Sequence, residues 1–166
     1  MRTSELDRQY LGRAGQLALK AGAQGNLPIG AVLCLDGEIV AEGMNAIWRP
    51  AAALTRHAEM EALRATPSNL WARARAMTLY TTLEPCLMCA GAILLHQIRR
   101  LVFGASDPYG GVHEAAHSLP GFFREQMERM EWMGPALPEE CDALYTRARE
   151  LEHERQAKSQ AGRAEP

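Results

Sequence analysis

Long apolar segments are missing from this sequence. Its 166 residues contain no uninterrupted run of about 18 apolar residues, the length that a helix needs to cross a bilayer. The N-terminal residues 1–7 also lack the apolar core of a secretory signal peptide. We therefore expect a cytoplasmic protein with no membrane partner, and the chain length fits one domain.

Cysteine is scarce, with only four in the chain. Cys86 and Cys89 belong to a metal-binding pattern described below, which leaves Cys34 and Cys141. A disulfide between these two is possible on number alone. Reduced, buried thiols are the expectation for a cytosolic protein.

A strong excess of basic residues is also missing. The net charge is −2, with +4 on residues 49–100 and −5 on residues 101–166. A nucleic-acid enzyme usually carries a larger basic footprint than this. The charge balance therefore argues against a large RNA partner and suits a small anionic or electron-rich substrate.

Two short motifs are present that together bind metal. His-Ala-Glu occupies residues 57–59, and Pro-Cys-Leu-Met-Cys follows at residues 85–89 after a gap of 25 residues. The imidazole of His57 and the thiolates of Cys86 and Cys89 make three ligands for one zinc ion per chain. A catalytic zinc keeps its fourth position open for water, and Glu59 is placed to act as the proton acceptor.

A purely structural zinc is the alternative reading of these motifs. It would need a fourth protein ligand, and the candidates are Asp107, His96, His113 and His117. None of them stands in a supporting spacing pattern. A non-catalytic, zinc-stabilised module therefore remains a minor alternative.

The order H-x-E followed by P-C-x-x-C is the signature of zinc-dependent nucleobase deaminases. Zinc lowers the pKa of its bound water towards about 7, and Glu59 can take the released proton. The hydroxide attacks the ring carbon that bears an exocyclic amine, and the same carboxyl returns the proton to the departing ammonia. The products are a carbonyl group and ammonia.

The hydrophobic pattern predicts an α/β domain in which helices flank a mixed sheet. Ser4 and Asp7 resemble a capping box, and Asp36-Gly37 is a strong hairpin signal. Both ligand motifs fall at helix N-termini, where the helix dipole stabilises thiolates. The expected helices span residues 6–23, 56–65, 86–97, 122–130 and 138–157, and the expected strands span 29–35, 38–44, 77–82 and 100–104, with a short one at Trp132. The domain is predicted over residues 1–158, with a frayed tail at 159–166.

From Tyr10 to about Leu144 the chain resembles the cytidine/deoxycytidylate deaminase superfamily. The closer likeness is to the branch of tRNA adenosine deaminases and guanine-deaminase-like nucleobase deaminases. The residues that carry it are 27–32 (Leu-Pro-Ile-Gly-Ala-Val), Asn45, 57–59, 82–92 and 102–105 with Asp107.

The resemblance implies a three-layer α/β/α, cytidine-deaminase-like fold with a mixed five-stranded sheet, and usually a homodimer. It also implies that Asn45 and the backbone near Ala58 hydrogen-bond the base. Asp107 and Tyr109 are further candidate substrate contacts, and Tyr109 could either stack on a base or be a surface aromatic of a turn.

Three departures from the family pattern concern the substrate. Residues 53–56 (Ala-Leu-Thr-Arg) replace the usual Asp-Pro-Thr, residues 113–120 replace a Gly-Ser-Leu stretch, and the C-terminal helix is less basic than expected for gripping tRNA. The leading hypothesis is therefore hydrolytic deamination of a free nucleobase, nucleoside or related amino-heterocycle. Deamination of a tRNA wobble adenosine is the alternative.

Overall fold

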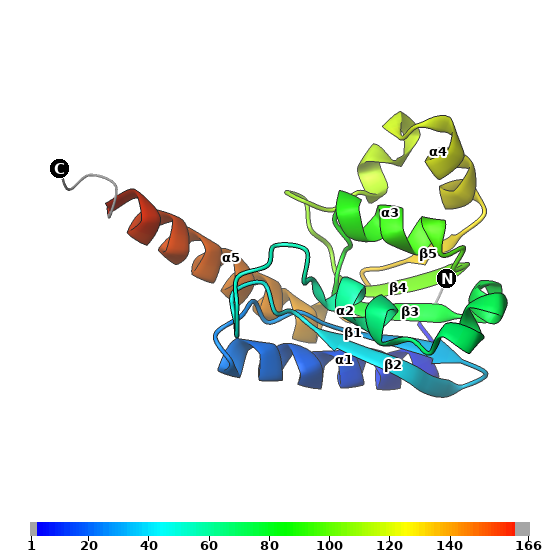
Figure 1. The fold of residues 1–166 in the computed structure, drawn as a ribbon, viewed down its shortest axis with the longest axis horizontal. Helices are drawn as coiled ribbons and strands as arrows, with labels where there is room; N and C mark the ends of the chain where they lie inside the picture. Colours follow the sequence, from blue (N-terminus) through cyan, green and yellow to red (C-terminus); the bar gives the residue numbers. More distant parts are fainter. Residues whose placement is uncertain (1–2, 162–166) are drawn as a thin grey trace.

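A five-stranded mixed sheet lies between two layers of helices in the structure, a computed structural model that describes residues 3–161 (Figure 1). The strand order is β2-β1-β3-β4-β5. The strand β1 pairs antiparallel with β2 and β3, while β3–β4 and β4–β5 are parallel. The predicted three-layer α/β/α fold with a mixed sheet is confirmed.

The elements agree with most of the ranges expected from the sequence. In chain order they are α1 (Glu5–Ala23), β1 (Gly30–Leu35), β2 (Glu38–Met44), α2 (Ala58–Ala65), the 3-10 helix η1 (Ser68–Ala76), β3 (Thr78–Leu83), α3 (Leu87–Leu95), β4 (Arg100–Ala105), the 3-10 helix η2 (His113–Ser118), α4 (Gly121–Glu128), β5 (Glu131–Met133) and α5 (Pro138–Ala161).

The central strand β1 shows how the two layers are divided. Because successive side chains of a strand point to opposite faces, Leu33 and Leu35 pack with residues of α2, α3 and α4 on one face. Val32 and Cys34 pack with residues of α1 and the start of α5 on the other face. The strand is buried along its whole length, which explains its continuous apolar sequence.

The turn between β1 and β2 is the predicted two-residue hairpin. Asp36 and Gly37 both have positive φ, 53° and 81°. This combination gives a turn whose twist matches that of the two strands.

The first helix is tied to the sheet by its N-terminal cap. The predicted capping box is present, with Ser4 and Asp7 exchanging hydrogen bonds. The buried carboxylate of Asp7 also accepts hydrogen bonds from Arg100 (2.8 and 3.1 Å) and from the hydroxyl of Tyr80 (2.9 Å). One carboxylate therefore joins α1 to β3 and β4.

Some expectations differ from the structure. The two 3-10 helices were not predicted, because a short 3-10 segment has no hydrophobic repeat of its own. The helix α3 is only half buried, since Leu87 and Leu95 are exposed. The helix α5 continues to Ala161 and extends beyond the sheet (Figure 1), while residues 162–166 of the expected tail lie outside the described residues.

The remaining cysteines are as expected, since Cys34 and Cys141 are free, buried thiols. Within residues 3–161, no helix combines the length and the apolar character that crossing a membrane requires.

Candidate active site

The helix α2 places His57 and Glu59. His57 is the N-cap residue of α2, with extended backbone angles, and Glu59 lies in the first turn. The helix rests directly on β2, because Gly43 lies in contact with the carbonyl oxygen of Ala58 and the amide of Ala62. The position of both motif residues is thus set by the contact between α2 and the sheet.

The helix α3 places the two cysteines. The strand β3 ends at Leu83, and Cys86 is the N-cap of α3 with Cys89 in the following turn. The sequence predicted this arrangement of both motifs at helix N-termini, although His57 and Cys86 are cap residues rather than members of the first turn. Cys89 is fully buried and Cys86 is partly exposed.

The three side chains meet in one group. The Nδ1 atom of His57 lies 3.6 Å from the Sγ of Cys86 and 3.6 Å from the Sγ of Cys89. The three candidate ligand atoms all lie within 4.8 Å of one another. Tetrahedral zinc with its usual Zn–S and Zn–N bond lengths holds nitrogen and sulfur about 3.6 Å apart. The donor types and their spacing therefore fit zinc.

The thiols of this group interact strongly. The hydrogen bond between the two thiols, with help from His57, lowers the pKa of Cys86 to about 4. The same bond and burial raise the pKa of Cys89. The hydrogen bond with Cys86 raises the pKa of His57. One thiolate is thus stabilised by the protein alone, and a cation would stabilise the second.

The carboxyl of Glu59 faces the same group. Its side chain is buried, with 4% of the residue exposed, and burial raises its pKa above the ordinary value. One oxygen accepts a hydrogen bond from the hydroxyl of Thr81 (3.0 Å), and the other accepts from the Sγ of Cys89 (3.5 Å). A carboxyl with a raised pKa can both take and return a proton near neutral pH.

A fourth protein ligand is not found among the residues that the structure describes. Within residues 3–161, the one group of three or more possible metal ligands that lie close together is His57, Cys86 and Cys89. Three of the four candidates are engaged elsewhere: His96 packs on Trp71, His113 stacks on Trp132, and the carboxylate of Asp107 accepts hydrogen bonds from its own loop. The fourth, His117, is exposed and does not belong to the ligand group. This arrangement is that of a site with one open position.

Asn45 has an unused hydrogen-bond donor. The residue is 1% exposed, and its Oδ1 accepts from the backbone N–H of Ile47 (3.3 Å). Its buried Nδ2 has no acceptor among the described residues. Buried amides are normally paired, so an orphaned donor points to a bound group that would accept from it.

Ala58 is the first residue of α2 and is fully buried. The amides of a helix's first turn have no acceptor within the helix. The backbone N–H of Ala58 is therefore placed where a ligand could accept from it.

The loop of Asp107 and Tyr109 lies next to Cys86, whose backbone pairs with that of Gly111. The Oδ1 atom of Asp107 accepts from the backbone amides of Tyr109 and Gly110 and from the hydroxyl of Tyr145 in α5. The ring of Tyr109 is 79% exposed and lies 4.2 Å from the guanidinium of Arg149. The substrate roles of Asp107 and Tyr109 stay predictions.

Sequence reasoning missed two features of the site. Glu84 lies in the stretch 82–92 that carries the family resemblance, but the sequence did not indicate that its carboxylate is buried. The helix α5 packs Ala148 and Leu151 against Leu27 and Ile47, and Arg155 lies over the ring of Trp48. Such long-range packing depends on the folded topology.

Comparisons with known proteins agree with this geometry. Residues 4–105 match the family described as cytidine and deoxycytidylate deaminase zinc-binding region. The chain is 38% identical over 146 residues to the tRNA-specific adenosine deaminase of Bacillus subtilis (strain 168), covering 84% of this chain and 86% of that protein.

Solved structures give the same result. A structure from a study of A-to-I editing by tRNA:A34 deaminases at the wobble position of transfer RNA has a TM-score of 0.65 and 33% identity, covering 82% of this chain and 99% of that chain. The guanine deaminase of Bacillus subtilis has a TM-score of 0.52 and 35% identity, covering 69% of each chain.

The fold and the comparisons together show that the chain is a deaminase, an enzyme that hydrolyses a C–N bond. The chain belongs to the cytidine and deoxycytidylate deaminase family, as the resemblance in the sequence implied.

Proposed function

We propose that this chain is a zinc-dependent tRNA adenosine deaminase, which converts a wobble adenosine and water to inosine and ammonia. The observation that carries the proposal is the His57, Cys86 and Cys89 group with the buried carboxyl of Glu59 beside it. The tRNA-specific relatives extend over more of the chain than the guanine deaminase does. This difference favours tRNA, the alternative in the sequence analysis, over a free base or nucleoside.

His57, Cys86 and Cys89 would hold one zinc ion. When bound, zinc supplies Lewis acidity, which activates water near neutral pH. Glu59 takes a proton from the attacking water and returns it to the amine that departs from the purine ring. The hydrogen bond from Thr81 fixes the direction of this carboxyl.

Asn45 and Ala58 would orient the base. The orphaned Nδ2 of Asn45 would donate to a ring nitrogen of the purine, and the backbone N–H of Ala58 would donate to a second acceptor. Because the contacts of Asp107 lie within its loop and with Tyr145, we assign it to holding the loop rather than to reading the base.

The net negative charge of the chain is compatible with RNA binding, because acidic side chains of α5 form ion pairs within the protein. On α5, Glu150 and Glu154 pair with Arg147. Arg149 and Arg155 lie over the rings of Tyr109 and Trp48, and Arg149 also pairs with Glu152 (2.7 Å). Arginine and aromatic side chains together suit unstacked bases of a single-stranded loop.

Mass spectrometry of an anticodon stem-loop RNA tests the proposal. Incubation with the purified protein should give a gain of about one dalton at the wobble adenosine, the change from amine to carbonyl. The matched variant Glu59→Gln should keep its zinc and lose about 10²–10⁴-fold in rate. Conversion of free bases or nucleosides, with the RNA left intact, would instead support the small-heterocycle hypothesis.

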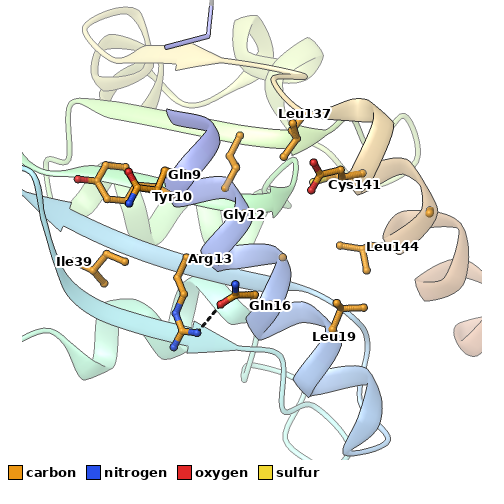
Figure 2. Close-up of a pocket in the computed structure, with 14 residues that line it drawn as sticks. Gln9, Tyr10, Gly12, Arg13, Gln16, Leu19, Ile39, Leu137, Cys141 and Leu144 are labelled. Carbon is orange, nitrogen blue, oxygen red and sulfur yellow. Dashed lines mark hydrogen bonds between the residues drawn. The ribbon is translucent and has the colours of Figure 1, made fainter. Parts of the chain in front are cut away.

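We also infer a homodimer formed through α3. Leu87 and Leu95 of this helix are 63% and 59% exposed, and Leu87 lines an apolar depression of about 280 Å³ between α3 and α4. In light scattering, Leu95→Glu should convert a dimer to a monomer. Leu19→Glu changes an equally exposed leucine of α1 (Figure 2), on the other side of the sheet, and should leave the dimer intact. A wild-type monomer at micromolar concentration would refute the inference.

A further inference from the structure

The carboxylate of Glu84 closes a loop beside the active site. The side chain is nearly buried, and each of its oxygens accepts one backbone N–H. Oε2 accepts from Asp107 (3.1 Å) and Oε1 accepts from His113 (3.0 Å). These two amides lie at the two ends of one segment, residues 107–113, so a single carboxylate holds both ends.

The same segment is joined to the residues that precede α3. The backbone N–H of Val112 donates to the carbonyl of Pro85 (3.2 Å), and the backbone of Gly111 pairs with that of Cys86. A Cβ atom at Gly111 would overlap the carboxyl group of Glu84. The segment therefore lies against Glu84 and Cys86 with no room between them.

The outer side of the segment is held by α5. The hydroxyl of Tyr145 donates to Oδ1 of Asp107 (3.0 Å), and the guanidinium of Arg149 covers the ring of Tyr109. Glu84 holds the backbone of Asp107 from the sheet side, while Tyr145 holds its side chain from the helix side. The segment is therefore held in place between α5 and the candidate metal ligand Cys86.

We propose that Glu84 is a positioning residue for deamination, because it holds segment 107–113 in the position where this segment forms one side of the substrate site. This inference rests on the proposed function. A buried carboxylate that accepts hydrogen bonds from two amide N–H groups is replaced poorly by a neutral side chain, because one of its two acceptor oxygens is then lost or replaced by a donor. Glu84 acts on the substrate through the loop and does not touch the reacting atoms.

The test is Glu84→Gln, which keeps the shape of the side chain and removes one acceptor. We expect KM for the stem-loop RNA to rise about tenfold, with kcat within threefold and one zinc per chain. Hydrogen exchange at the amides of Asp107 and His113 should become faster. Glu114→Gln, an exposed glutamate of η2, is the matched control and should change none of these values.

A second variant, Gly111→Ala, tests the same contact from the loop side. It should reproduce the rise in KM, whereas Gly121→Ala, where an added Cβ meets nothing within 4 Å, should not. An unchanged KM in Glu84→Gln, or a loss of zinc, would overturn the proposal. If the wild type converts no RNA, the proposed function fails, and the exchange measurement still decides whether Glu84 holds the loop.

Discussion

Two buried asparagines show how single residues divide between stability and function. Asn26 and Asn45 are each 1% exposed. The Oδ1 of Asn26 accepts from the backbone amides of Trp48 and Arg49, both at 2.9 Å. The Oδ1 of Asn45 makes one bond of 3.3 Å, and its Nδ2 has no acceptor among the described residues. The hydrogen bonds of Asn26 hold the fold, while Asn45 keeps an unpaired donor, which under the proposed function would donate to the base.

Substitution of each asparagine by leucine should separate these two roles. Asn45→Leu removes an unpaired donor, so we expect the free energy of unfolding to change by about 1 kcal/mol or less while kcat/KM falls at least about tenfold. Asn26→Leu removes the acceptor of two backbone amides, those of Trp48 and Arg49, and should lower stability by about 2–4 kcal/mol. Urea denaturation and kinetics on the same samples give both values. Equal destabilisation by the two variants would contradict the assignment of Asn45.

The grouping of His57, Glu59, Cys86 and Cys89 could be predicted from the sequence because these residues belong to two local motifs. The contacts of Glu84 could not, since they form only when residues 107–113 fold back onto it. The two contacts that fix Asp107 come from residues 23 positions before it and 38 positions after it. Such residues carry no spacing pattern that a reader of the chain could use.

At the scale of elements, the contact between α2 and β2 determines the position of His57 and Glu59 in the site. Gly43 of β2 touches the backbone of Ala58 and Ala62, so any side chain there must push α2 away from the sheet. Gly43→Ala should therefore lower stability by about 1–3 kcal/mol and reduce zinc content. Gly15→Ala on α1 meets nothing within 4 Å and should be neutral or stabilise by about 0.5–1 kcal/mol. Thermal unfolding and metal analysis measure both effects, and full zinc in Gly43→Ala would contradict this account.

The junction of α1 with β4 gives a pH-dependent contribution to stability. Burial alone would raise the pKa of Asp7, but hydrogen bonds from Arg100, Ser4 and Tyr80 lower it well below its ordinary range. A carboxyl with a depressed pKa stabilises the fold above its unfolded-state pKa, about 4, and that contribution is lost as the pH falls.

Asp7→Asn tests this junction. The substitution removes the more buried of the two acidic partners of Arg100 and leaves Glu131 (3.1 Å) as the other, so we expect a loss of up to about 3 kcal/mol at pH 7. The difference from the wild type should shrink as the pH falls below about 4. Urea denaturation between pH 7 and pH 3 measures it, and a difference independent of pH would show that the ion pair is not its cause.

The elements themselves were predictable where a local signal existed. The Asp-Gly turn fixed the β1–β2 hairpin, and apolar runs marked the buried strands. The segments η1 and η2 lack any such period and were missed. The helix α3 is almost wholly apolar, but composition does not reveal which of its sides faces a neighbour in the folded chain.

For the whole molecule, the net charge does not show where individual charges lie. Arginines of residues 49–100 pair with acids on different elements, Arg56 and Arg64 with Glu61 and Arg73 with Asp36. The arginines that lie over aromatic rings near the site, Arg149 and Arg155, come from the segment with the most negative charge. The location of a charge, and not the sum over a segment, determines what it can bind.

The tRNA proposal therefore implies a strong dependence on salt despite the net charge of −2. A loop held by about three phosphate contacts should lose roughly twentyfold in kcat/KM when salt rises from 50 to 200 mM. Arg155→Gln should lower kcat/KM at low salt and flatten this slope, because one contact is removed. Arg129→Gln, an exposed arginine paired with Glu125 at the end of α4, is the control and should keep the wild-type slope. If kcat/KM for the stem-loop does not change with salt, the RNA is not bound through its phosphate backbone. The substrate would then be recognised through the base alone.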